Sequence, residues 1–144
     1  MKRLALLAAT AVLAPAAVAS AHPGHDPGEF TGKTAQRRDV SLRLTGSGTA
    51  FRTGEIRWRA ACPGGRHVTG VLLLPRIAIR PGGVVNLDLG GGTFLAGRFS
   101  RFWSLAGTFR VVTAAGCRTP VLRWSATTCV KGPRPRFVRR FAWR

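Results

Sequence analysis

The residues that could carry out chemistry are few in this 144-residue chain. It contains three cysteines, three histidines, five acidic residues and no tyrosine. Nucleophilic catalysis needs a serine or cysteine beside a base, and a metal site needs several ligating side chains at defined spacing. The sequence has no serine-centred elbow, no metal-type spacing and no glycine loop that precedes a helix. We therefore expect no enzyme, no catalytic residue, no cofactor and no metal.

Cys62 and His67 are close in sequence, and a thiolate beside an imidazole is the arrangement of cysteine-dependent enzymes. In an exported chain a disulfide explains Cys62 better than catalysis does. The acids Asp39, Glu55 and Asp88 each fall on the polar phase of a strand pattern, where solvation or pairing with arginine explains them.

The N-terminal histidines suggest a second kind of chemistry. If the chain is cleaved after Ala21, the free amine and imidazole of His22 could chelate copper, with His25 and Asp26 close by. Pro23 removes the amide that such amino-terminal motifs often use. We therefore interpret the segment as a flexible leader.

The cysteines Cys62, Cys117 and Cys129 allow three single disulfide bridges. Loop-closure entropy differs little among them, between about 3 and 4.5 kcal/mol, and cannot choose. We prefer Cys62 with Cys117, because each lies at a strand end beside a tryptophan-bearing strand and the bridge would tie early strands to late ones. Cys129 would then be free, buried or paired between chains.

The elements that must position these residues are short strands. Apolar and polar residues alternate with a period of two in many short runs, and Gly or Pro clusters separate the runs. The runs cover 40–44, 55–62, 67–74, 85–89, 94–99, 103–112 and 121–126. Helical spacing is missing after the N-terminal apolar run. The pattern predicts an all-β fold, a single antiparallel β-sandwich or small flattened barrel of about eight to nine strands in a meander.

The hairpin at 107–126 defines the faces of this sheet most clearly. Phe109 and Trp124 fall on the apolar phase, and Arg110 and Arg123 on the polar phase. We expect the first pair in the core and the second pair on a basic outer face. The run at 67–74 is more continuously apolar, which predicts a strand covered on both faces or an oligomer contact.

The N-terminus reads as a secretory signal peptide, with a basic start, an apolar run and a small-residue cleavage site ending at Ala21. We expect four segments: a signal peptide at 1–21, a flexible leader at 22–29, an antiparallel β domain at 30–128 and a basic aromatic tail at 129–144. The expected location is outside the cell or on the exterior of the cell envelope.

Charge is the most unusual bulk property. The formal net charge is +18, and removal of Lys2 and Arg3 from that sum leaves +16. Such an excess attracts anionic polymers over a long range. For an exported chain the expected partners are anionic cell-envelope polymers or a membrane surface, and we do not expect nucleic acid. The alternative is that GC-rich coding, which favours arginine, produced a merely solvated face.

The tail interleaves cations with large apolar side chains, a composition typical of contacts with anionic membranes or polyanions. Its candidate contact residues are Lys131, Arg134, Arg136, Phe137, Arg139, Arg140, Phe141, Trp143 and Arg144. The alternative is a last edge strand followed by a disordered end.

The chain resembles a group of small exported actinobacterial all-β proteins of unassigned function. The stretches that carry the resemblance are 30–36 (FTGKTAQ), 40–44 (VSLRL), 58–65 (WRAACPGG), 107–111 (GTFRV) and 117–126 (CRTPVLRWSA). The resemblance implies an all-β domain, two framework cysteines matching Cys62 and Cys117, and a tryptophan matching Trp124. It implies no activity. Pro120 stands where such proteins often have glycine, and the chain continues beyond their usual end with Cys129 and the tail.

Together these patterns predict a non-enzymatic exported β domain whose cationic surface associates with anionic envelope polymers or lipid headgroups. The alternative function is binding of a small apolar ligand in a cavity of the barrel or sandwich. The oligomeric state stays open.

Overall fold

The structure is a computed structural model that describes residues 28–101, 103–128 and 135–136. Within these ranges the chain forms strands and no α-helix. The strands are β1 (Glu29–Thr34), β2 (Asp39–Leu44), β3 (Ala50–Ala61), β4 (His67–Leu74), β5 (Ile77–Ala78), β6 (Val84–Gly90), β7 (Thr93–Arg101), β8 (Ser104–Arg110) and β9 (Leu122–Thr127). The predicted all-β fold is confirmed. Glu29, the last residue of the expected leader, is already the first residue of β1.

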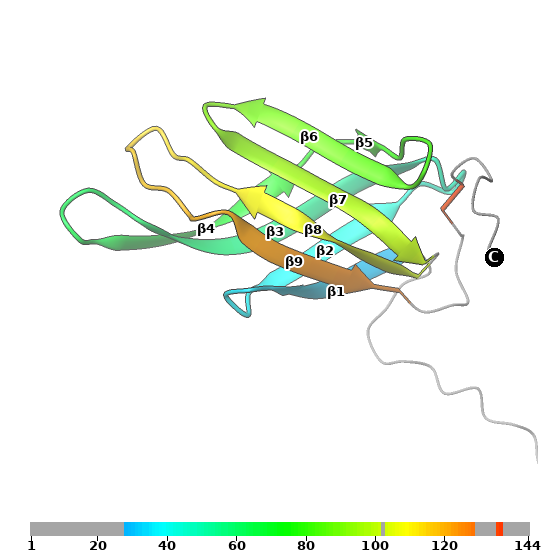
Figure 1. Cartoon of the computed structure of the whole chain (residues 1–144), viewed down its shortest axis with the longest axis horizontal. Helices are drawn as coiled ribbons and strands as arrows, with labels where there is room; N and C mark the ends of the chain where they lie inside the picture. The colour runs from blue at the N-terminus through cyan, green and yellow to red at the C-terminus, as the bar shows by residue number, and fades with distance from the viewer. Residues whose placement is uncertain (1–27, 102, 129–134, 137–144) are drawn as a thin grey trace, which may run out of the picture.

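All nine strands belong to one antiparallel sheet, in the order β4-β3-β2-β1-β9-β8-β7-β6, with β5 paired to β3. Strands β1 to β4 form one meander and β6 to β9 a second, and the pairing of β1 with β9 joins the two. The sheet curls into a half-barrel, with β6 to β9 in front of β2, β3 and β4 in the view of Figure 1. β4 and β6 are its two edges.

The short strand β5 lies at one end of the opening between the two edges of the sheet. It pairs with Ala50 and Phe51 at the start of β3, whereas β4 pairs with β3 from Gly54 onward. A turn then leads from β5 into β6, and the Arg80 N–H donates to the Val84 carbonyl at 2.8 Å. One end of the half-barrel is therefore bridged by β5, while β4 and β6 remain separate edges.

The core lies between the two layers. Phe30 of β1, Phe51 of β3 and Phe99 of β7 contact one another with ring centroids 5.5 to 6.0 Å apart. Each is at most 3% exposed. Aromatic rings bury large areas in such contacts. Because the three rings come from both meanders, they hold the layers together.

Each meander has a tryptophan that packs over a glycine. Trp58 on β3 lies over Gly70 on β4, where an added Cβ would fall 2.4 Å from the ring. Trp124 on β9 reaches Gly97 on β7, where the corresponding distance is 2.8 Å. In β8, Gly107 lies between Trp124 and Gly97, and an added Cβ there would be only 1.9 Å from the Ala96 carbonyl oxygen. The glycines allow a large ring and closely spaced backbones in the same layer.

The predicted faces of the hairpin are confirmed. Phe109, Val111, Leu122 and Trp124 are all buried. Arg123 is exposed, as the alternation predicts. The period of two therefore located the core side of β8 and β9 correctly.

The expectation that residues 67–74 form a strand covered on both faces is wrong. β4 is an edge strand, and Val68, Val71 and Leu73 are 37%, 44% and 69% exposed. Only Leu74 of β4 is buried. A continuous apolar run here produces an uncovered outer face, and the predicted oligomer contact remains a prediction.

Candidate functional site

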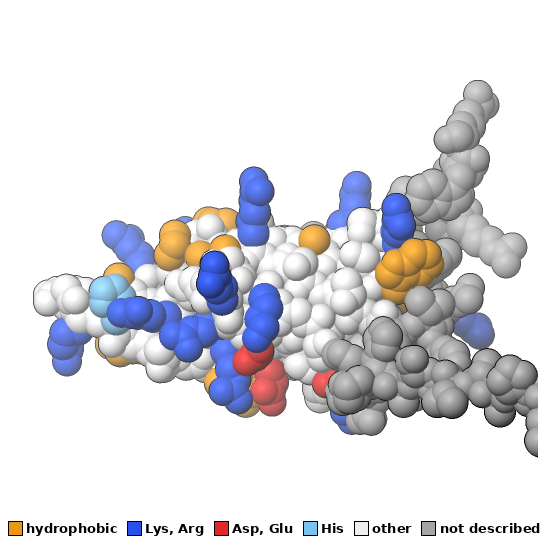
Figure 2. Space-filling model, turned by 90° about the horizontal axis from the view of Figure 1, so that it is seen from below, with side chains coloured by type: hydrophobic (Ala, Val, Ile, Leu, Met, Phe, Trp, Pro, Cys, Tyr) orange, Lys and Arg blue, Asp and Glu red, His pale blue; other side chains and the backbone are white. Residues whose placement is uncertain are grey.

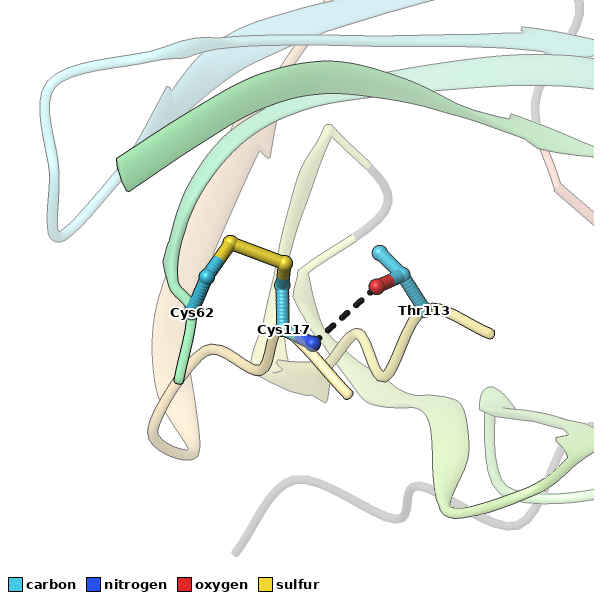
Figure 3. Close-up of a disulfide and its surroundings, with 3 residues drawn as sticks. All are labelled: Cys62, Thr113 and Cys117. Atoms are coloured by element: carbon cyan, nitrogen blue, oxygen red, sulfur yellow. Dashed lines mark hydrogen bonds between the residues drawn. A yellow bond between two sulfur atoms is a disulfide. The ribbon is translucent and has the colours of Figure 1, made fainter. Parts of the chain in front are cut away.

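A disulfide joins Cys62 and Cys117, as predicted, and is shown in Figure 3. The residues are separated by 55 positions, so the bridge links the turn after β3 to the loop before β9. In that loop, the Cys117 N–H donates to Thr113 Oγ1 at 3.1 Å. Ala61 and Arg118 also exchange backbone hydrogen bonds of 3.1 and 2.8 Å. This end of the half-barrel is thus fixed by covalent and hydrogen bonds. A disulfide is compatible with an extracellular location.

A polar groove of about 380 Å³ lies at this end of the molecule. Its lining side chains come from the β1–β2 turn, from β3, from the start of β4 and from the segment before β9. They are Gln36, Arg38, Arg59, Ala61, His67 and Pro120. We call it the arginine groove.

The β1–β2 turn is held against β3 by one side chain. The Gln36 Nε2 donates to the Arg59 carbonyl at 2.8 Å, and the Arg59 N–H donates to Gln36 Oε1 at 2.9 Å. Thr34 Oγ1 also accepts hydrogen bonds from the Gln36 and Arg38 N–H groups, each at 3.2 Å. These hydrogen bonds fix the backbone positions of Arg38 and Arg59.

The arginine groove is electrostatically one-sided. Two guanidinium groups and an imidazole line it, and no acidic residue does. Asp39 is close in sequence, but its carboxylate accepts a 2.5 Å hydrogen bond from Lys33 Nζ. That bond, together with the charges of Lys33, Arg57 and Arg38, lowers the pKa of Asp39. Arginine guanidinium groups recognise phosphate, sulfate and carboxylate oxygens, so the groove is suited to anions.

The surrounding surface repeats this charge pattern. In Figure 2, Lys and Arg side chains gather at one end of the face around a histidine, and the acidic side chains appear farther along. Next to the groove, Arg57 pairs with Val71 of β4, and its charge contributes to the lowered pKa of Asp39. The groove is therefore part of a wider cationic face.

A second hollow, of about 480 Å³, lies at the β6–β7 turn. It is lined by Asn86, Leu87, Asp88, Gly90, Gly91, Gly92, Phe94, Leu95, Ala96 and Arg110. Its charged groups are already engaged. Arg110 Nε donates to the Gly92 carbonyl at 2.8 Å, and the guanidinium lies over the Phe94 ring, 5.7 Å from its centroid. Asp88 Oδ1 accepts from the Gly90 N–H at 2.9 Å. This hollow offers less to an anion than the arginine groove.

Most of the predicted tail contact lies outside the described residues. Of its candidate residues only Arg136 is described; it is exposed, and its N–H donates to the Gly48 carbonyl at 2.6 Å. The neighbouring Pro135 is buried. Cys129 and the candidate copper ligands His22, His25 and Asp26 also lie outside the described ranges.

The described residues do not form the Cys62–His67 catalytic pair or a group of metal ligands. Cys62 is bonded to Cys117, and His67 is exposed, so the two do not form a thiolate–imidazole pair. Within 28–101, 103–128 and 135–136, no three His, Cys, Asp or Glu side chains gather as metal ligands would. The described part of the chain also has no helix that is long and apolar enough to cross a membrane.

Sequence reasoning did not single out Gln36, Arg38 or Arg59. Each is one polar residue in a turn or on the wet side of a strand, and many others in this chain look the same. The groove exists because the turn folds back on β3, a contact between residues 23 positions apart. Comparison with known proteins gives no matching family model, no matching curated protein and no matching solved structure.

Proposed function

We propose that the protein is a non-enzymatic exported domain that binds anionic polymers of the cell envelope. One observation carries the proposal: the arginine groove places Arg38, Arg59 and His67 around one hollow with no acid in its lining. The groove would hold one anionic group of the polymer, and the surrounding cations would attract neighbouring groups along its chain. The resemblance to small exported actinobacterial proteins, the N-terminal signal sequence and the disulfide all fit this setting.

A polymer fits the arrangement better than a flat bilayer surface. The sheet is curled (Figure 1), so a flat surface would reach only part of it, whereas a flexible chain can follow the curve. The exposed apolar side chains Val71 and Leu73 are on edge strand β4 and do not line the groove. We therefore treat lipid headgroups as the second candidate ligand, to be tested beside the polymer.

The test compares two double variants with the same loss of charge. Arg38→Gln with Arg59→Gln removes the cations of the groove. Arg52→Gln with Arg98→Gln removes two exposed cations elsewhere. Binding is measured by fluorescence anisotropy with labelled poly(glycerol phosphate), from 50 to 500 mM salt, and by sedimentation with phosphatidylglycerol vesicles.

The groove variant should bind the polymer at least about tenfold more weakly than the control, and the slope of log K against log salt should flatten by about two. Equal losses in both variants would mean that net charge alone causes binding, which contradicts the proposal. Vesicle binding that exceeds polymer binding would assign the surface to lipid headgroups instead.

The same salt titration distinguishes polymer binding from the alternative function, binding of a small apolar ligand. A small apolar ligand in a cavity of the sheet would bind with little dependence on salt, because ions screen charges and not apolar contacts. Binding of an apolar fluorophore that is unchanged by salt and by the groove variant would favour that alternative.

A further inference from the structure

We propose that β4 is a self-association strand, and that two copies of the protein pair through it, antiparallel and across a two-fold axis at Gly70. The sheet would then continue from one copy into the other. This inference does not depend on the function of the arginine groove.

The two edges of the sheet are protected very differently. Natural proteins block edge strands with charged residues, prolines or bulges. β6 has an acid at Asp88, a register shift between Asp88 and Gly90, and a backbone bond from Arg80 to Val84. β4 pairs with β3 without a register shift and contains neither lysine, arginine nor proline from His67 to Leu74. β4 is thus the unprotected edge.

The backbone groups that β4 leaves unpaired can be identified from the ladder. Cys62 donates to the Arg66 carbonyl, whereas Ala61 bonds to Arg118 on its other side. Ala61 pairs with His67, so the backbone groups of His67 point away from β3. Hydrogen bonding alternates along an antiparallel strand, so Thr69, Val71 and Leu73 have the same orientation. Among the described residues, none pairs with that side of β4.

These outward groups are self-complementary. In the proposed register, Thr69 lies opposite Val71 of the second copy and His67 lies opposite Leu73 of the second copy. Each of these residues then donates and accepts one backbone hydrogen bond. Gly70 of each copy lies on the axis, at a position where opposing Cα atoms approach to about 4.5 Å. Glycine leaves that approach free of side chains.

Side chains on the outer face support the same pairing. Val71 and Leu73, which are 44% and 69% exposed, would contact Thr69 and His67 of the second copy and lose exposed apolar area. The nearest β3 cations do not prevent this. Arg57 of one copy and Arg59 of the second copy would be three strand spacings apart, about 14 Å. This distance is beyond the screening length at physiological salt.

The strand that fits against β4 is β4 of a second copy, and not β6 of that copy. Pairing β4 with β6 of the next molecule would be head-to-tail and would leave edges for further growth. It would also place the apolar side chains of β4 against the acid and the irregular register of β6. The two-fold pairing of β4 uses the unprotected edge on both sides and is closed.

The test is sedimentation velocity of the full chain over a concentration series in 300 mM salt, with Val71→Lys plus Leu73→Lys as the disrupting variant. Val121→Lys is the control, because Val121 is also exposed, at 55%, but lies before β9. We expect a dimer for the parent chain and the control, and at least about tenfold weaker dimerisation for the β4 variant. Circular dichroism confirms that each variant folds.

Hydrogen exchange locates the contact. In the dimer the Thr69 amide should exchange at least about tenfold more slowly than in the β4 variant, while the Asn86 amide on β6 should not change. A monomer at every concentration overturns the proposal. So does a dimer that survives the β4 variant, a series of larger oligomers, or protection at β6.

Discussion

The β1–β4 half and the β6–β9 half of the sheet are both four-stranded antiparallel meanders, but they differ in where their charges lie and in how their edge strands are protected. The first contains the arginine groove and an uncharged, unprotected edge. The second has no lysine or arginine from Gly82 to Gly97, and its edge is bulged and acidic. Two halves with one strand pattern therefore present different surfaces.

The halves also differ in how their tryptophans are held. Trp124 Nε1 donates to the Ala96 carbonyl at 3.2 Å. Trp58 Nε1 is buried and has no hydrogen-bond partner among the described residues. Trp124 spans β8 to reach Gly97, whereas Trp58 packs against Gly70 on an edge strand. The comparison indicates that the β6–β9 layer is packed more rigidly than the layer ending at β4.

The largest effect is expected for alanine at Gly107, with Gly70 as its counterpart in the other half. Gly107→Ala would place a Cβ 1.9 Å from the Ala96 oxygen, and since backbone cannot move aside we expect a loss of about 4 kcal/mol or more. Gly70→Ala would meet the Trp58 ring beside a free edge, and we expect about 1–3 kcal/mol. Urea unfolding followed by tryptophan fluorescence measures both.

Gly46→Ala is the control, because no atom lies within 4 Å of an added Cβ there. Equal losses for Gly70→Ala and Gly107→Ala would contradict the difference in rigidity.

The disulfide tests whether the two halves depend on one covalent link. Cys62→Ser with Cys117→Ser opens a loop of 55 positions, and the entropy of the unfolded chain predicts a loss of about 4 kcal/mol in the free energy of unfolding. Urea unfolding of this variant, with the oxidised parent as control, measures the loss. A loss under about 1 kcal/mol would show that the Ala61–Arg118 bonds hold this end without the bridge.

The tryptophans should respond differently to phenylalanine. Trp124→Phe loses a hydrogen bond worth about 1 kcal/mol as well as packing. Trp58→Phe loses packing but also removes an unpaired buried donor, which relieves about 1–3 kcal/mol. We expect Trp124→Phe to be the more destabilising by about 2 kcal/mol in thermal or urea unfolding. The reverse order would mean that Trp58 Nε1 has a partner when the protein is in solution.

The smallest effect concerns Asp39. Its pKa is lowered in the folded state below the ordinary value of 3.8, first by the hydrogen bond from Lys33. The carboxylate therefore contributes stability above about pH 4, and that contribution is lost as pH falls through the lowered pKa. Asp39→Asn should reduce the acid-side decline of the melting temperature by a small amount. High salt should shrink the difference, because the pair is exposed.

An Asp39→Asn variant whose melting temperature declines between pH 6 and 2 as steeply as that of the parent would show that the Lys33 pair contributes nothing to folding.

The strand character, the core faces and the preferred disulfide could be predicted from local sequence patterns. The period of two is a local property of the backbone, so the burial of Phe109 and Trp124 could be inferred without knowing their neighbours. The preference for Cys62 with Cys117 rests on the place of each cysteine at a strand end beside a tryptophan-bearing strand, and on a bridge that ties early strands to late ones. Such inferences succeed when a residue's environment follows from its own strand.

The arginine groove and the edge strands could not be predicted from these patterns, because both depend on long-range contacts. The groove depends on Gln36 reaching the Arg59 backbone, and β4 is an edge because no described strand pairs with its far side. An apolar strand between two layers and an apolar strand at an edge have the same composition, so the pattern of residues 67–74 is compatible with a strand covered on both faces and with an oligomer contact. What distinguishes them is which strands lie beside them, and that depends on long-range pairing that a local pattern does not encode.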